Sequence, residues 1–220
     1  MHAILFLEHI QSCHEVTQPG AYAIGGELVY CNSDGWQLAM QFSNKSNFLF
    51  DSPYWTDSNL LGNPGEAPAN TDGKYSAFNN LHVYQIKLCF HACVTLEVPQ
   101  SHSGKTLHQL FNEVSVGREG LGFDGGVADF RAAVGLSGGS GYCWNKVKIN
   151  FDDVDSNYKC RGRLALIQNN ECSSVTANDA IGVGVTEANG ASTGSGITIF
   201  PGHVTNINAV LWVRSKGMCI

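Results

Sequence analysis

Charged residues are scarce in this chain. They make up 15% of its 220 residues, and the 13 lysines and arginines are scattered singly along it. The formal net charge is −6 at pH 7. Tracking a nucleic-acid backbone requires clustered basic side chains that neutralise phosphates. Nucleic acid is therefore not an expected partner.

Long apolar runs are missing as well. No stretch approaches the roughly 20 consecutive apolar residues of a membrane-spanning helix, so we expect no membrane span. Met1–Leu7 is apolar over only about five consecutive residues, with no lysine or arginine before them, which is too short for a signal peptide. We interpret residues 1–12 as an apolar arm and residues 13–220 as a single domain.

The sequence lacks the motifs of common enzyme classes. Gly120–Gly125 matches GxGxxG by letter but has no preceding parallel strand or βαβ context. Ser103–Thr106 resembles the end of a phosphate-binding loop, but Pro99 stands where that loop needs its first glycine. Gly139-Ser140-Gly141 lies in a glycine-rich turn, and no Ser, His and Asp arrangement for acyl transfer stands out. We therefore expect a protein that is not an enzyme.

Eight cysteines are present, an even number, and none forms a CxxC pair of the zinc-ribbon kind. This usage is typical of disulfide-bonded proteins in an oxidising compartment, so we expect an extracellular or cell-surface location. The sequon Asn44-Lys45-Ser46 fits a secreted glycoprotein and makes Asn44 a candidate glycosylation site.

The 25 glycines and few charges favour many turns and strands over long helices. Lys105–Val114 has apolar residues at helical spacing, with Ser103 as its cap, and a second short helix is expected over 127–134. A bent hairpin is expected over Val83–Val98; whether Cys89 and Cys93 bond to each other stays open. Strands are also predicted at 21–24, 27–30, 37–42, 146–151, 163–168, 180–185 and 207–214. The predicted fold class is β-dominated α+β, with a twisted, mostly antiparallel sheet and several disulfides.

The best-defined local pattern lies between Cys13 and Trp36. Two apolar and aromatic runs flank Gly25-Gly26, with a cysteine before the first run and another after the second. This pattern predicts a β-hairpin closed at its base by a Cys13–Cys31 disulfide.

In this stretch the chain resembles fibrinogen-like domains, the family of ficolins, angiopoietins and, more distantly, intelectins. After its first cysteine that family has Gly-x-Tyr-x-Ile, Val-Tyr-Cys and an Asp-Gly motif ending in tryptophan. The matching segments here are Gly20–Ile24, Val29–Cys31 and Asp34–Trp36. Gly141–Asn145 and Ala209–Arg214 are similar to segments of intelectin-like chains. A further disulfide, Cys143–Cys160, is expected.

The resemblance implies binding of glycans beside calcium. Asp153, Asp155 and Asn157 alternate before a cysteine, as the ligands of the family's calcium loop do, and their oxygen atoms suit calcium. A solvated turn is the alternative interpretation. Glu171–Gly184 resembles the intelectin stretch where calcium holds a sugar diol, with Asn178-Asp179 in place of its histidine. The sequence does not identify the residues that would bind the glycan.

Two non-enzymatic functions are predicted. The first is a self-assembling subunit of a surface filament or extracellular polymer, in which Ile4, Leu5, Phe6 and Leu7 add as a strand to the sheet edge of the next copy. The alternative for this arm is pairing within its own chain. The second function is a calcium-assisted, glycan-binding lectin.

Overall fold

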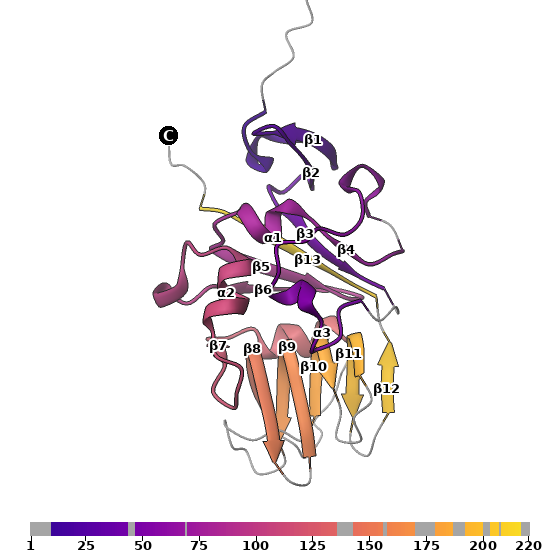
Figure 1. Cartoon of the computed structure of the whole chain (residues 1–220), viewed down its shortest axis with the longest axis vertical. Coiled ribbons are helices and arrows are strands. Elements are labelled where there is room, and N and C mark those ends of the chain that lie inside the picture. The colour runs from indigo at the N-terminus through magenta and orange to yellow at the C-terminus, as the bar shows by residue number, and fades with distance from the viewer. Residues whose placement is uncertain are drawn as a thin grey trace, which may run out of the picture.

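The computed structural model describes residues 10–43, 47–68, 70–135, 143–155, 158–169, 179–186, 192–199, 203–206 and 208–216. These residues form two antiparallel sheets with three short α-helices (Figure 1). This architecture confirms the predicted β-dominated α+β fold.

The first sheet brings together both ends of the described chain. Its strands follow the order β1-β2-β3-β13-β5-β6, with β4 paired to β3. The last strand, β13, therefore lies between β3 and β5 and closes the sheet. The bounds are β1 Gly20–Ile24, β2 Glu27–Cys31, β3 Gln37–Phe42, β4 Gly73–Lys74, β5 Gln85–Cys89, β6 Cys93–Glu97 and β13 Ala209–Arg214.

The second sheet is a meander in which each strand pairs with its neighbours in sequence, from β7 to β12. Figure 1 shows it at the opposite end of the molecule from the β1–β2 hairpin. The bounds are β7 Leu121–Phe123, β8 Cys143–Asp155, β9 Tyr158–Asn169, β10 Asp179–Thr186, β11 Ser192–Ile199 and β12 His203–Asn206. The sequence analysis predicted neither β11 nor β12.

The helices are α1 (Ser76–Asn80), α2 (Leu107–Glu113) and α3 (Val127–Ala133). The predicted cap of α2 at Ser103 is wrong. Thr106 caps this helix in a capping box, because its side chain accepts from the Gln109 amide and the Gln109 side chain accepts from the Thr106 amide. Four 3-10 turns, η1 to η4, span Cys13–Glu15, Pro53–Trp55, Pro64–Glu66 and Gln100–His102.

One hydrophobic core joins the two sheets. It includes Leu88 from β5, Phe111 from α2 and Ile149 from β8, all buried in the same cluster. Trp55 lies fully buried within it and packs against Phe42 and Phe111 at ring-centroid distances of 5.9 and 5.1 Å. Both sheets therefore contribute apolar side chains to the same core.

A buried polar contact crosses this core. Asn150 in β8 donates through Nδ2 to the carbonyl oxygens of Phe111 (2.9 Å) and Val114 (2.8 Å), at the end of α2. Its Oδ1 accepts from Arg163 Nη1 at 2.8 Å, and Arg163 Nε donates to the Phe50 carbonyl at 2.7 Å. Asn150 has φ +56°, a left-handed conformation that asparagine tolerates better than most residues. We call Asn150 and Arg163 the core polar pair.

Two disulfides form among the described residues. Cys13 bonds to Cys31 as predicted, and Cys89 bonds to Cys93, which face each other across the β5–β6 turn. The predicted Cys143–Cys160 bond is wrong. On the β8–β9 ladder Cys143 lies opposite Asn169, nine residues beyond Cys160. That offset corresponds to about 30 Å along a strand, whereas a disulfide needs Cα atoms within about 7 Å.

Several predicted features lie outside the described residues: the segment Ile4–Leu7, the sequon at Asn44 and the candidate calcium ligand Asn157. They stay predictions. No helix among the described residues is long and apolar enough to cross a membrane.

The core polar pair generates a stability prediction. Asn150→Ala removes the donor to two carbonyls and the acceptor for Arg163, so it should lower the free energy of unfolding by about 3 kcal/mol in chemical denaturation. Asn112→Ala is the matched control. Asn112 also donates to two carbonyls, of Thr56 and His108, but it is exposed, so water can replace it at a cost under about 1 kcal/mol. Equal losses in the two variants would contradict the role given to Asn150.

Candidate functional site

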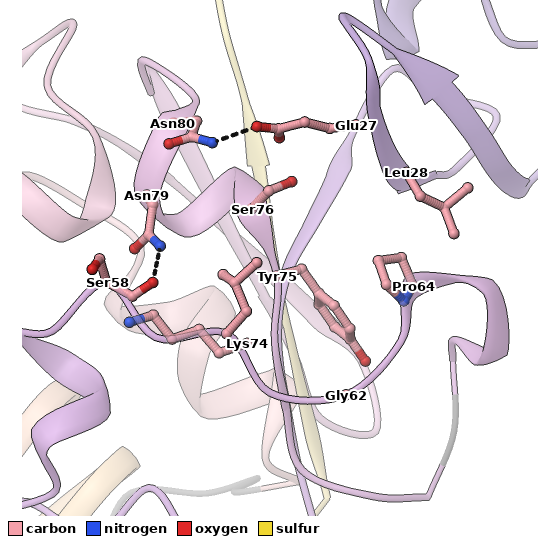
Figure 2. Close-up of a pocket in the computed structure, with 11 residues that line it drawn as sticks. Glu27, Leu28, Ser58, Gly62, Pro64, Lys74, Tyr75, Ser76, Asn79 and Asn80 are labelled. Carbon is pink, nitrogen blue, oxygen red and sulfur yellow. Dashed lines mark hydrogen bonds between the residues drawn. The ribbon is translucent and has the colours of Figure 1, made fainter.

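The candidate site is a pocket of about 330 Å³ between β2, the loop that follows η2, and α1. We call it the α1 pocket, and Figure 2 shows the side chains that line it. Its volume falls in the range of small-molecule sites. The segments that line it lie far apart in sequence, at 27–28, 58–64 and 74–80.

The short strand β4 holds these segments together. Lys74 lies opposite Met40 on β3, and on its other side it forms an isolated bridge with Leu61. In that bridge the Leu61 amide donates to the Lys74 carbonyl at 2.9 Å, and the Lys74 amide donates to the Leu61 carbonyl at 2.8 Å. This bridge fixes the loop before β4 against the first sheet. The helix α1 begins two residues after β4 ends.

Lys74 contributes a fully buried side chain to the pocket wall. Its Nζ donates to the Asp57 carbonyl oxygen at 2.6 Å and lies 3.2 Å from Asp57 Oδ1. The same ammonium lies 4.6 Å from the centre of the Phe78 ring. Burial lowers the pKa of Lys74, while the hydrogen bond and charge of Asp57 oppose that shift. The cation is thus already paired from within the chain.

Tyr75 forms the floor beside Lys74. Its hydroxyl donates to Gln41 Oε1 of β3, and burial, followed by the charge of Glu66, raises its pKa. Gly73 makes room for the ring, because a Cβ atom at that position would lie 2.6 Å from Tyr75 Cζ. Any larger residue at position 73 would push the tyrosine out of place.

Two asparagines of α1 turn their amides toward the other walls. Asn80 Nδ2 donates to Glu27 Oε1 on β2, and Asn79 Nδ2 donates to the Ser58 carbonyl, both at 2.8 Å (Figure 2). These bonds tie α1 to β2 on one side and to the loop on the other. The amides therefore have fixed orientations before any ligand arrives.

Two polar atoms of this wall have no hydrogen-bond partner in the part of the chain that the structure describes. Ser76 Oγ and Asn79 Oδ1 are buried and unpaired, and Ser76 is only 8% exposed. Buried polar groups without a partner are uncommon in folded proteins, because each one loses its bonds to water without a replacement. Both atoms are closed to solvent, so a ligand hydroxyl would supply the missing partners once the wall shifts to admit it.

The rim of the pocket is apolar. Leu28 is 47% exposed and Leu60 is 53% exposed, and both line the opening. The site therefore combines a polar wall with an apolar edge, a composition typical of small-ligand sites. Its described lining residues include no histidine and no cysteine. Within the described residues, no group of three or more His, Cys, Asp and Glu side chains is placed to hold a metal ion.

None of the site residues predicted from sequence lines the α1 pocket. Asp153 is buried in β8, where Arg118 Nε lies 2.8 Å from its Oδ1. Asp155 ends the same strand opposite Tyr158, and Asn157 lies outside the described residues. Calcium binding at these three residues stays a prediction. No pattern in the sequence indicated the pocket.

Comparison with known proteins gives no match for this chain among family models, curated proteins or solved structures.

The fit between Gly73 and Tyr75 is directly testable. Gly73→Ala should lower the free energy of unfolding by about 1–3 kcal/mol, measured by chemical denaturation, because the added methyl group overlaps the Tyr75 ring. Gly117→Ala is the control, since a Cβ there has no atom within 4 Å. A neutral Gly73→Ala variant would show that the ring is not held as described.

Proposed function

We propose that this protein is a non-enzymatic, extracellular lectin that binds a saccharide in the α1 pocket. The observation that carries the proposal is the pair of buried, unpartnered atoms in its wall, Ser76 Oγ and Asn79 Oδ1. A sugar hydroxyl both donates and accepts hydrogen bonds, so it suits a serine hydroxyl and an amide oxygen equally well.

The charges around the pocket favour a neutral ligand. The Lys74 ammonium already has the Asp57 carbonyl and carboxylate, and Glu27 already accepts from Asn80. Neither charge needs an ionic partner from the ligand. The apolar rim formed by Leu28 and Leu60 would cover the C–H face of a sugar ring.

Two further observations support an extracellular binding role. The Cys13–Cys31 disulfide closes the β1–β2 hairpin, the segment through which the chain resembles fibrinogen-like domains. Disulfides are characteristic of proteins that work in oxidising compartments. Calcium at Asp153, Asp155 and Asn157 would act outside the α1 pocket, so the effect of a chelator distinguishes a calcium-assisted site from the pocket itself.

The test of the lectin proposal is a glycan array of the purified protein, with and without a chelator, followed by calorimetric titration of the best sugar. Ser76→Ala and Asn79→Leu should each weaken binding at least about tenfold, the equivalent of one lost hydrogen bond. Asn112→Leu, on α2 outside the pocket, is the matched control and should bind like the parent protein.

Ser76→Ala also separates binding from folding. Because the hydroxyl has no partner among the described residues, its removal should leave the free energy of unfolding unchanged or raise it by up to about 1 kcal/mol. Loss of affinity without loss of stability would identify a ligand contact. Silence on every sugar, or a bound sugar indifferent to both variants, would refute the proposal.

Self-assembly is the second candidate function. It is supported by β1, which is the terminal strand of the first sheet in the described residues and leaves one backbone edge unpaired there. Such an edge can accept a strand from another chain. In this proposal Ile4–Leu7 of one copy adds to the sheet of the next, a contact that propagates without closing.

Deletion of residues 1–10 tests the self-assembly candidate. The truncated protein should be monomeric in light scattering, and replacement of Ile4, Leu5, Phe6 and Leu7 by serine should have the same effect because the arm loses its apolar contacts. An unchanged oligomer after deletion would rule out the arm as the subunit contact.

A further inference from the structure

A second cavity, of about 360 Å³, lies between η1 and the adjoining ends of β5 and β13. We call it the β13 cleft. Arg214 and Lys216 line one side, where β13 ends, and Tyr84 and Glu97 line another. It shares no lining residue with the α1 pocket, so what binds there is independent of the function proposed above.

Two cations without an ionic partner, Arg214 and Lys216, line this cleft, and Lys87 lies over the same Trp36 ring as Arg214. Lys87, Arg214 and Lys216 make no ion pair with any carboxylate among the described residues, although the chain as a whole is acidic. Elsewhere most described cations are neutralised. Ion pairs with a carboxylate are formed by Lys74, Lys105, Arg118, Lys146 and Arg161.

The guanidinium of Arg214 is held in place before any ligand binds. Its Nε donates to Gln85 Oε1 at 2.8 Å, its Nη2 donates to the same oxygen, and its Cζ lies 4.5 Å from the centre of the Trp36 ring. No described residue accepts a hydrogen bond from its Nη1. A fixed guanidinium with uncommitted donors is well suited to the geometry of an oxyanion.

A second cation reinforces the positive potential. Lys87 Nζ lies 4.2 Å from the centre of the same Trp36 ring. Burial lowers the pKa of Lys87, Asp34 opposes the shift, and the charge of Arg214 lowers it further. The two like charges therefore repel each other, and an anion beside them would relieve the repulsion.

The remaining groups of the cleft can complete an anion site. Lys216 is exposed, and its Nζ lies 6.0 Å from the centre of the Tyr84 ring. Tyr84 lines the same cavity, and its hydroxyl donates to no described residue. Glu97 is the one carboxylate in the lining, and its Oε1 accepts from Gln85 Nε2. Its negative charge opposes anion binding and sets a limit on the affinity.

We propose that the β13 cleft binds an oxyanion, the sulfate, phosphate or carboxylate group of a small ligand, between Arg214 and Lys216. Arg214 supplies oriented donors, Lys216 supplies a mobile charge, and Tyr84 adds a hydroxyl. Because Glu97 lines the same cavity, its replacement by a neutral residue should strengthen binding of the oxyanion. Screening of charges by salt would not produce this increase.

The test is a titration of the full chain, followed by NMR through the Trp36 indole and Arg214 Nε–H signals. The probes are sodium sulfate, sodium phosphate and sodium glucuronate, each compared with sodium chloride at equal ionic strength. At least one oxyanion should saturate where chloride does not. The salt that binds most tightly shows whether the site prefers sulfate, phosphate or a carboxylate.

Four variants decide the assignment. Arg214→Gln and Lys216→Gln should each weaken the tightest oxyanion at least about fivefold, and Glu97→Gln should strengthen it two- to fivefold, as expected for partly exposed charges. Lys105→Gln removes one positive charge outside the cleft and should change little. Because Lys216 is exposed, its variant should fold even where Arg214→Gln does not. No oxyanion saturation, or an equal effect of Lys105→Gln and Lys216→Gln, would overturn the proposal.

Discussion

The core polar pair is the contact on which the rest of this structure depends. Arg163 carries a charge into the interface between the sheets, where burial lowers its pKa to about 10 despite the nearby Asp51 carboxylate. Its guanidinium lies 4.4 Å from the centre of the Phe50 ring, and Asn150 links it to the last turn of α2. An unpaired charge at this depth would be strongly destabilising. Movement of the Phe50 carbonyl or of Asn150 away from Arg163 would therefore lower the stability of the fold.

The consequences of this contact reach the α1 pocket through α2. With its last turn held by Asn150, α2 brings His108 Nε2 to within 2.9 Å of the Thr56 carbonyl oxygen. The next residue, Asp57, receives the Lys74 ammonium, and Lys74 pairs β4 with both β3 and the loop. Each step is a hydrogen bond between neighbours. The pocket wall is thus fixed from the interface between the sheets, through contacts that involve no ligand.

Features with a local cause were predictable from the sequence. The Gly25-Gly26 turn flanked by Cys13 and Cys31 defines a hairpin by itself, and the apolar spacing over 107–114 defines α2. The strands β11 and β12 were missed because Ser192–Ile199 is rich in serine, threonine and glycine, and it becomes a strand by pairing with β10. The Cys143–Cys160 bond failed because β8 and β9 are longer than their apolar cores suggest. The β8–β9 hairpin therefore carries the two cysteines far apart.

The candidate site was not predictable for a different reason. Its walls come from three distant segments, and what marks it is the burial of Lys74 and the unpaired hydroxyl of Ser76. Neither property exists until the chain folds, because an isolated Lys or Ser in a sequence is indistinguishable from a solvated one. Among the groups that sequence reasoning did select, Asp153 pairs with Arg118. Spacing alone could not show that an arginine from another segment would meet this carboxylate.

The most direct measurement is a crystal structure of the protein soaked with the sugar that it binds most tightly. Our account predicts the sugar in the α1 pocket, with one hydroxyl within hydrogen-bonding distance of Ser76 Oγ and another within that distance of Asn79 Oδ1. A sugar bound elsewhere, with both atoms still unpaired, would contradict it.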